Sequence, residues 1–244
     1  MSTKTGSELK VLTTGILKGA FDHIATRFEA DTGHRVTMSW GPSTGTSSEA
    51  SPVRVRSGES IDVLIMVNTS MDDLVATGHF VPLHRRDVAI SKIGVAVKEG
   101  QAPPDISTAA ALRQTLLNVR SIGYSEGASG TYVSTLLLEK LGIAQEVQPK
   151  CHVVLGRKFV GASVAEGEVE VGIQQISELV LESGITVVGP LPDEVQKLSV
   201  VSAAVSAKAD NMEAAQQFVA FLSTPFAADA LRASGLDLPA RQPE

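Results

Sequence analysis

The regular alternation of short apolar runs with segments of helical periodicity is the strongest constraint on the fold. Residues 8–13 form an apolar run that ends in a turn, and large apolar side chains then recur every three or four residues. These side chains are Leu17, Phe21, Ile24 and Phe28. Residues 35–40 follow as a second strand candidate, after a glycine that can end the helix. This order predicts a parallel β-α-β unit at the start of the chain.

The same alternation continues along the rest of the sequence. Apolar runs predict further strands at 62–67, 93–97, 121–124, 153–156, 169–173 and 198–205. Helices are expected over 71–77, 107–117 and 159–165, and beginning at 128, 211 and 225, with Ser107 and Asn211 as N-caps. Only 4% of residues are aromatic, while Ala, Val, Ile and Leu dominate. This pattern is typical of an α/β fold with helices on a mostly parallel sheet.

Length and charge limit the classes of function. A chain of 244 residues with 43% hydrophobic content can bury one large core or two small ones. The formal net charge of -6 gives no broad basic surface, so nucleic acid is not expected as a partner. Cys151 is the single cysteine and the histidines are scattered, which predicts no internal disulfide and no metal site.

The N-terminus has no basic region followed by an apolar run, and no later stretch is long enough to span a bilayer. As written, the sequence predicts a cytoplasmic protein without membrane insertion. A periplasmic protein is expected instead if a secretory leader has been removed.

Three loops rich in hydroxyl groups and glycine follow predicted strands. They are Thr13-Thr14-Gly15, Ser43-Thr44-Gly45-Thr46, and residues 125–131, which include Ser129, Gly130 and Thr131. Such residues are common in turns, but three such loops at strand ends favour a pocket for an oxyanion or carboxylate. The loops lack the glycine motifs of nucleotide-binding sites, so no cofactor is expected.

Two pairs of cationic residues flank predicted strands. Arg157 and Lys158 follow a predicted strand and can supply fixed positive charge to a carboxylate, although such a pair is also common on a solvated surface. Arg54 and Arg56 are expected to point to solvent. Neither a nucleophile elbow nor a Cys/His pairing is present, so covalent hydrolysis is not expected.

The chain resembles the molybdate-binding-protein-like (type 2) branch of periplasmic solute-binding proteins along almost its whole length. The resemblance is carried by residues 8–12, 58–67, 124–132, 171–173 and 214–222. It implies two α/β lobes joined by two crossing strands, with the ligand in a cleft between the lobes. The expected boundaries are 1–88 with 200–244 for lobe 1, and 89–199 for lobe 2.

The resemblance also implies the position of the ligand-binding residues. Matching the family's pocket position by position implicates Gly15, Ser43 or Thr44, Ser129, the neighbourhood of Arg157 and Lys158, and Gln175. Molybdate binders usually have a hydroxyl, an apolar residue and a tyrosine where this chain has Gly15, the Arg157 region and Gln175. A cation and an amide suit a larger polycarboxylate better than a tetrahedral oxyanion.

Further details are similar to a sub-branch that includes aconitate isomerase. They are residues 45–47, Arg54, residues 58–59, 103–107 and 124–130. This similarity implies a cofactor-free isomerase of an unsaturated polycarboxylate, which moves an allylic proton; the sequence leaves the proton carrier unassigned. The alternative is a non-catalytic protein that binds a molybdate-like oxyanion or a carboxylate and delivers it to an ABC permease, provided that it is exported.

Overall fold

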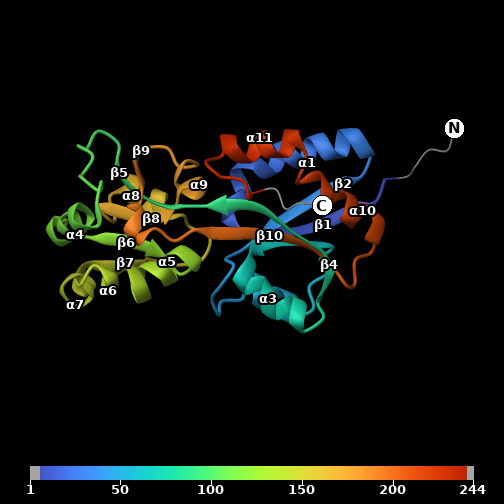
Figure 1. Ribbon diagram of the computed structural model, residues 1–244, viewed down its shortest axis with the longest axis horizontal. Helices are drawn as coiled ribbons and strands as arrows, with labels where there is room; N and C mark the ends of the chain where they lie inside the picture. Colours follow the sequence, from blue (N-terminus) through green and yellow to red (C-terminus); the bar gives the residue numbers. More distant parts are fainter. Residues whose placement is uncertain (1–5, 241–244) are drawn as a thin grey trace. The chain divides into compact units, whose positions relative to one another are not determined.

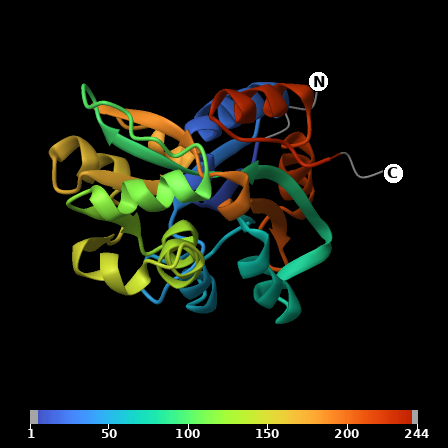
Figure 2. The ribbon, with the colours of Figure 1, turned by 60° about the vertical axis from the view of Figure 1, so that its left-hand side comes forward.

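The computed structural model describes residues 6–240, and these form two compact units, each with its own sheet. The first unit runs up to Ile90 and resumes at Ser199, and the second comprises Ser91–Leu198. Figures 1 and 2 show strands and helices in both units, which confirms the α/β fold class. The prediction about a leader concerns residues 1–5 in part, and these lie outside the described residues.

The sheet of the first unit has the strand order β2-β1-β3-β10-β4. Its strands are β1 (Glu8–Thr13), β2 (Arg35–Trp40), β3 (Val63–Val67), β4 (Phe80–Ser91) and β10 (Ser199–Ser206). β1 pairs in parallel with β2 and β3, whereas β10 is antiparallel to β3. The carboxyl ends of β1, β2 and β3 therefore lie at one edge, where loops of α/β proteins commonly bind ligands.

Helices cover both faces of this sheet (Figure 1). They are α1 (Lys18–Thr32), α2 (Ser51–Arg56), α3 (Asn68–Ala76), α10 (Met212–Phe221) and α11 (Pro225–Ala233). Phe21 and Phe28 of α1 pack against Phe218 of α10, with ring centroids 6.1 and 5.0 Å apart. On α3, Met71 and Leu74 join a second cluster with Leu12 and other strand residues. Gly33 adopts a left-handed conformation and ends α1, as predicted.

The sheet of the second unit has the order β7-β6-β8-β5-β9. Its strands are β5 (Ile93–Lys98), β6 (Ile122–Ser125), β7 (Cys151–Val154), β8 (Val171–Gln175) and β9 (Ile185–Pro190). β6 is parallel to β7 and β8, and β5 is antiparallel to β8 and β9. The parallel strands again end at one edge, where the loops after β6, β7 and β8 meet.

The helices of this unit are α4 (Ala109–Asn118), α5 (Ala128–Tyr132), α6 (Leu138–Lys140), α7 (Ala144–Val147), α8 (Val160–Glu166) and α9 (Ile176–Leu179), with a π-helical turn at Val133–Leu137. Glycines let α8 and α9 approach the sheet closely. A Cβ atom on Gly172 would lie 2.6 Å from Val164, and one on Gly94 would lie 2.6 Å from Ile176. A side chain at either position would therefore force its neighbour in the helix to shift.

Most predicted elements are confirmed within a few residues, and of the two predicted N-caps one is confirmed and one is wrong. Asn211 caps α10, with its side chain accepting from the N–H of Ala214 at 3.0 Å, as predicted. The predicted cap at Ser107 is wrong, because Thr108 accepts from the N–H of Ala111 at 3.1 Å. Among the described residues, no helix combines the length and apolarity needed to cross a bilayer.

Candidate functional site

Loops at the carboxyl ends of the parallel strands of the first unit bring together several of the predicted residues. Thr14 and Gly15 directly follow β1, and both are buried. Ser43 and Thr44 follow β2, the neighbouring strand. The Ser43 side-chain oxygen accepts a hydrogen bond from the N–H of Val67 at 3.3 Å, which ties this loop to the end of β3.

Four hydroxyl oxygens in these loops are buried without a hydrogen-bond partner among the described residues. They belong to Thr13, Thr14, Thr44 and Ser47. A buried polar group without a partner costs about 1–3 kcal/mol, and such groups are rare in proteins. Four in one pair of neighbouring loops therefore indicate a place where a ligand oxygen can accept their hydrogen bonds. Thr13 and Ser47 were not predicted as separate site residues.

Arg54 holds the end of β2 in place. Its guanidinium donates to the Ser39 hydroxyl at 2.9 Å and to the Trp40 carbonyl at 3.2 Å, and it forms an ion pair with Glu59. The Arg54 side chain is only 12% exposed, so the prediction that it points to solvent is wrong. Its carbonyl and hydroxyl partners lie on a strand distant in sequence, which the spacing of the arginines does not reveal. Arg56 is exposed, as expected.

In the second unit, the loop predicted at residues 125–131 follows β6, and its second half forms the start of α5. Ser129 is buried, and Gly130 lies so close to Ser125 that a Cβ atom would be 1.5 Å from the Ser125 carbonyl oxygen. Thr131 is exposed, and both its hydroxyl and its N–H donate to the Gly127 carbonyl, at 3.0 and 2.9 Å. The Thr131 hydroxyl therefore stabilises the first turn of the helix.

The cationic pair lies in the turn between β7 and α8. Lys158 donates to Glu166 at 2.7 Å and to Glu168 at 2.9 Å, and these hydrogen bonds raise the pKa of its ammonium group above the ordinary value. Two carboxylates thus already neutralise the Lys158 charge. Arg157 is exposed in the same turn.

Two adjacent glutamines end β8 and are both buried. The Gln175 side-chain oxygen accepts from the Ser91 hydroxyl at 2.7 Å, whereas that of Gln174 accepts from the first N–H of α8, on Val160, at 2.7 Å. Gln174 also hydrogen-bonds Glu178 on α9. Burial raises the pKa of the Glu178 carboxyl to about 7, and the Gln174 hydrogen bond opposes that rise. Glu178 was missed in the sequence because nothing in its neighbours predicts this burial.

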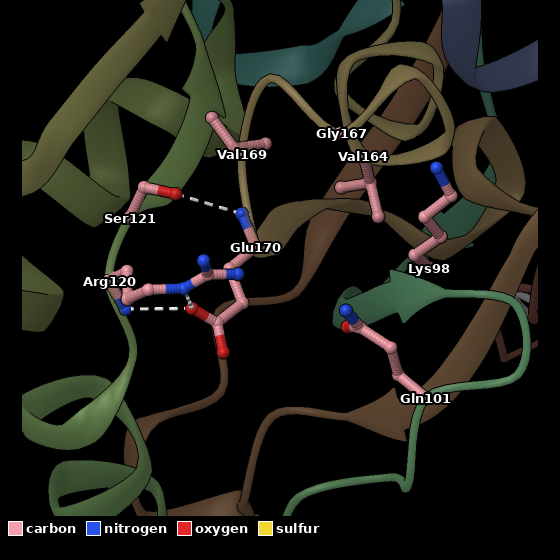
Figure 3. A pocket seen from close by; sticks show the side chains of 8 residues that line it. All are labelled: Lys98, Gln101, Arg120, Ser121, Val164, Gly167, Val169 and Glu170. Atoms are coloured by element: carbon pink, nitrogen blue, oxygen red, sulfur yellow. Dashed lines mark hydrogen bonds and ion pairs between the residues drawn. The ribbon is translucent and has the colours of Figure 1, made fainter.

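Residues 6–240 contain no cluster of three or more His, Cys, Asp or Glu side chains suited to hold a metal ion. A cavity of about 180 Å³ in the second unit lies at the other end of the sheet, beside Arg120 and Ser121 before β6 and Glu170 before β8 (Figure 3). Arg120 donates to Glu170 at 3.0 Å across one side of this cavity. None of the predicted ligand residues lines it.

Comparisons with known proteins extend over nearly the whole chain. The family model for bacterial extracellular solute-binding proteins matches residues 9–237. An aconitate isomerase from Pseudomonas sp. is 37% identical, with 96% of this chain and 89% of the relative covered. The molybdate-binding protein ModA of Azotobacter vinelandii is 26% identical, with 95% of this chain and 90% of the relative covered.

Solved structures show the same fold. The periplasmic molybdate-binding protein of Azotobacter vinelandii matches with a TM-score of 0.75 at 24% identity, covering 95% of this chain and all of that one. A periplasmic thiamin-binding protein matches with a TM-score of 0.74 at 14% identity, covering 99% of this chain and 86% of that one. Both similarities support the two-lobed binding-protein fold that the resemblance implied. The chain belongs to the bacterial extracellular solute-binding protein family.

Proposed function

We propose that the protein is a cofactor-free isomerase of a small unsaturated polycarboxylate, which interconverts trans- and cis-aconitate by moving an allylic proton. The observation that carries this proposal is the group of unpartnered buried hydroxyls on Thr13, Thr14, Thr44 and Ser47. Hydroxyls that lack a partner in the protein are ready to donate to carboxylate oxygens. The relative that is 37% identical is an aconitate isomerase, which names the polycarboxylate to test first.

Both units supply residues in this proposal. The first unit contributes hydroxyls and backbone N–H groups, and the second contributes a buried hydroxyl, an amide and positive charge. The proposed ligand residues are Thr14, Gly15, Ser43, Thr44, Ser129, Gly130, Thr131, Arg157, Lys158 and Gln175. Lys158 donates to both Glu166 and Glu168, which leaves one of its three N–H groups for a ligand oxygen.

A second function is favoured by the family itself. Bacterial extracellular solute-binding proteins and the ModA relative suggest a protein that binds an anion outside the cytoplasm and delivers it to an ABC permease. This function needs the same donors in the first unit but no proton transfer.

One experiment separates the two functions. Purified protein is mixed with trans-aconitate, and formation of cis-aconitate is followed by chromatography, while thermal shifts are recorded with both aconitates, citrate and molybdate. Turnover supports the isomerase. Stabilisation by an anion without turnover supports the binding function, and absence of both refutes the proposed site.

Substitution of Thr14 tests the hydroxyl donors directly. Thr14→Val keeps the shape of the side chain and removes one donor, so we expect the affinity for the stabilising anion to fall by about tenfold, or about 1.4 kcal/mol. Stability without ligand should stay unchanged or rise, because the lost hydroxyl has no partner in the free protein. The control Thr37→Val lies on the same sheet but is exposed and bonded to Glu8, and it should leave affinity unchanged.

A further inference from the structure

The proposed isomerisation needs a group that can take up and release a proton near neutral pH. The hydroxyls of the first unit can bind carboxylates, but an aliphatic hydroxyl is a poor proton carrier at that pH. Lys158 is held as a cation by two carboxylates. The reaction therefore requires a further residue at the ligand-binding edge of one unit.

We propose that Glu178 is the general acid–base group that carries the proton between the two carbons of the substrate, an inference that rests on the proposed function. Glu178 lies in the first turn of α9, which follows Gln175 at the end of β8 directly. Gln174 links Glu178 to the start of α8, because the Gln174 side chain hydrogen-bonds both Glu178 and the N–H of Val160, the first residue of α8. The turn that carries Arg157 immediately precedes α8.

The sheet explains how the carboxyl group of Glu178 comes to be shielded from solvent, although the residue as a whole is half-buried. Gly94 has no side chain, so Ile176 of α9 packs directly on β5, and the Ile176 N–H donates to the Lys92 carbonyl at 2.9 Å. Ser177 is fully buried, and its hydroxyl has no hydrogen-bond partner among the described residues. The first turn of α9 thus holds a shielded carboxyl group and, on the preceding residue, a buried hydroxyl without a partner among the described residues.

The protonation behaviour of Glu178 fits this role. A glutamate in the first turn of a helix is ordinarily stabilised as the carboxylate, which lowers its pKa. Here burial outweighs that effect and raises the pKa to about 7. A carboxyl group with a pKa near neutral pH can both accept and return a proton. A carboxylate that only caps a helix does not require a raised pKa.

The chemical step is balanced without a cofactor. The Glu178 carboxylate removes a proton from the methylene carbon of aconitate, and the electron pair of the broken C–H bond forms the new double bond to the central carbon. The original double bond shifts its electrons towards the former vinyl carbon, where charge delocalises into the attached carboxylate. The protonated Glu178 then returns the proton to that carbon, and a new C–H bond forms. Rotation about the bonds of the delocalised intermediate before the return sets the cis or trans product.

Glu178→Gln tests the inference, because it retains the size and the hydrogen-bonding capacity of the side chain but cannot take up a proton. We expect kcat to fall by about 10²–10⁴-fold with little change in substrate affinity. Glu182→Gln, the same substitution four residues further on, is the matched control and should retain turnover. Glu178→Asp should recover part of the activity, because it keeps the titrating group.

The pH profile of the unmodified protein gives an independent readout that does not depend on folding of a variant. kcat/KM should follow a group that titrates near the pKa of Glu178, about 7, and Glu178→Asp should shift that titration. α9 packs against β5, β8, β9 and α8. The charged residues in and beside these elements are Lys92, Lys98, Glu99, Arg157, Lys158, Glu166, Glu168, Glu170 and Glu182. Neutral variants of Lys98 and Glu182, which lie outside the proposed ligand residues, should leave the titration in place.

The outcomes separate this inference from the proposed function. If the unmodified protein binds trans-aconitate without turnover, both the proposed isomerase function and the role of Glu178 are refuted. Turnover that survives in Glu178→Gln, or a kcat/KM without a group titrating near pH 7, would refute only the role of Glu178. Lost turnover with retained affinity in Glu178→Gln, together with an active Glu182→Gln, would support it.

Discussion

Replacing Glu178 with glutamine should stabilise the protein at high pH, and the size of the effect follows from the burial of this carboxyl group. Its pKa rises from 4.5 to about 7 on folding, so folding favours the protonated form. Glu178 therefore costs nothing below pH 4.5, begins to destabilise the fold as pH rises through 4.5, and reaches its full cost above about pH 7. The difference between the pKa values of 4.5 and about 7 lowers the free energy of unfolding by about 3 kcal/mol, at about 1.4 kcal/mol per pKa unit.

Glutamine at position 178 carries no charge at any pH, so the variant avoids this cost. At pH 8 we expect its free energy of unfolding to exceed that of the unmodified protein by about 3 kcal/mol, which for a chain of this length corresponds to about 6–12 °C in Tm. At pH 4.5 and below the two should unfold together. Thermal and urea unfolding from pH 4 to 8.5, with Glu182→Gln as control, measure the difference. A difference that does not change with pH would refute the assignment of a buried, titrating carboxyl.

Three further predictions concern other parts of the fold. Gly130→Ala should lower the free energy of unfolding by about 3 kcal/mol in urea titrations, because the new Cβ collides with the Ser125 carbonyl; an unchanged midpoint would contradict that contact. Arg54→Met should cost about 2 kcal/mol and weaken anion binding, since it removes the donor to half-buried acceptors on Ser39 and Trp40, while Arg56→Met should do neither. The thiol of Cys151 should react with iodoacetamide more slowly in the folded than in the urea-unfolded protein at pH 7.5, since burial raises its pKa; equal rates would count against its burial.

The α/β alternation could be predicted from the sequence because buried parallel strands leave continuous apolar runs. β1, β2, β3 and β5 have such runs or a clear alternation, and their observed bounds fall within a residue of those expected. For the central strands β1, β3 and β5 the predictions work because burial on both faces of a sheet restricts side-chain chemistry at nearly every position.

Two edge strands, β4 and β9, were missed for the opposite reason, whereas the edge strand β2 keeps an alternation that could be recognised. β4 is an edge strand whose middle carries Pro82, His84, Arg85 and Arg86, and many of its side chains are exposed or half-buried. β9 is the edge strand of the other sheet, and it has no fully buried residue. An edge strand pairs on one side only, so solvent tolerates polar residues and proline in it, and the periodicity is lost.

Much of the candidate site depends on contacts between residues distant in sequence. The hydroxyl-rich loops could be recognised from composition, because their residue types are unusual at successive strand ends. That the Thr13 and Ser47 hydroxyls lack partners could not be predicted, since it depends on which groups the folded chain brings near them. The same holds for Arg54, which finds its acceptors on β2, 14 and 15 residues earlier.

The two proposed functions need different chemical groups. Both need hydrogen-bond donors for the anion, but only the isomerase needs a group that takes up and returns a proton. Holding an anion needs donors only, and in the proposed site these are the unpartnered hydroxyls of the loops after β1 and β2, which suit a molybdate-like oxyanion as well as a carboxylate. Moving a proton needs a titrating group, and a buried carboxyl lowers stability at neutral pH. Selection for binding alone gives no reason to keep that cost. If Glu178→Gln stabilises the protein and abolishes turnover while binding persists, proton transfer depends on Glu178 in the first turn of α9, whereas anion binding does not.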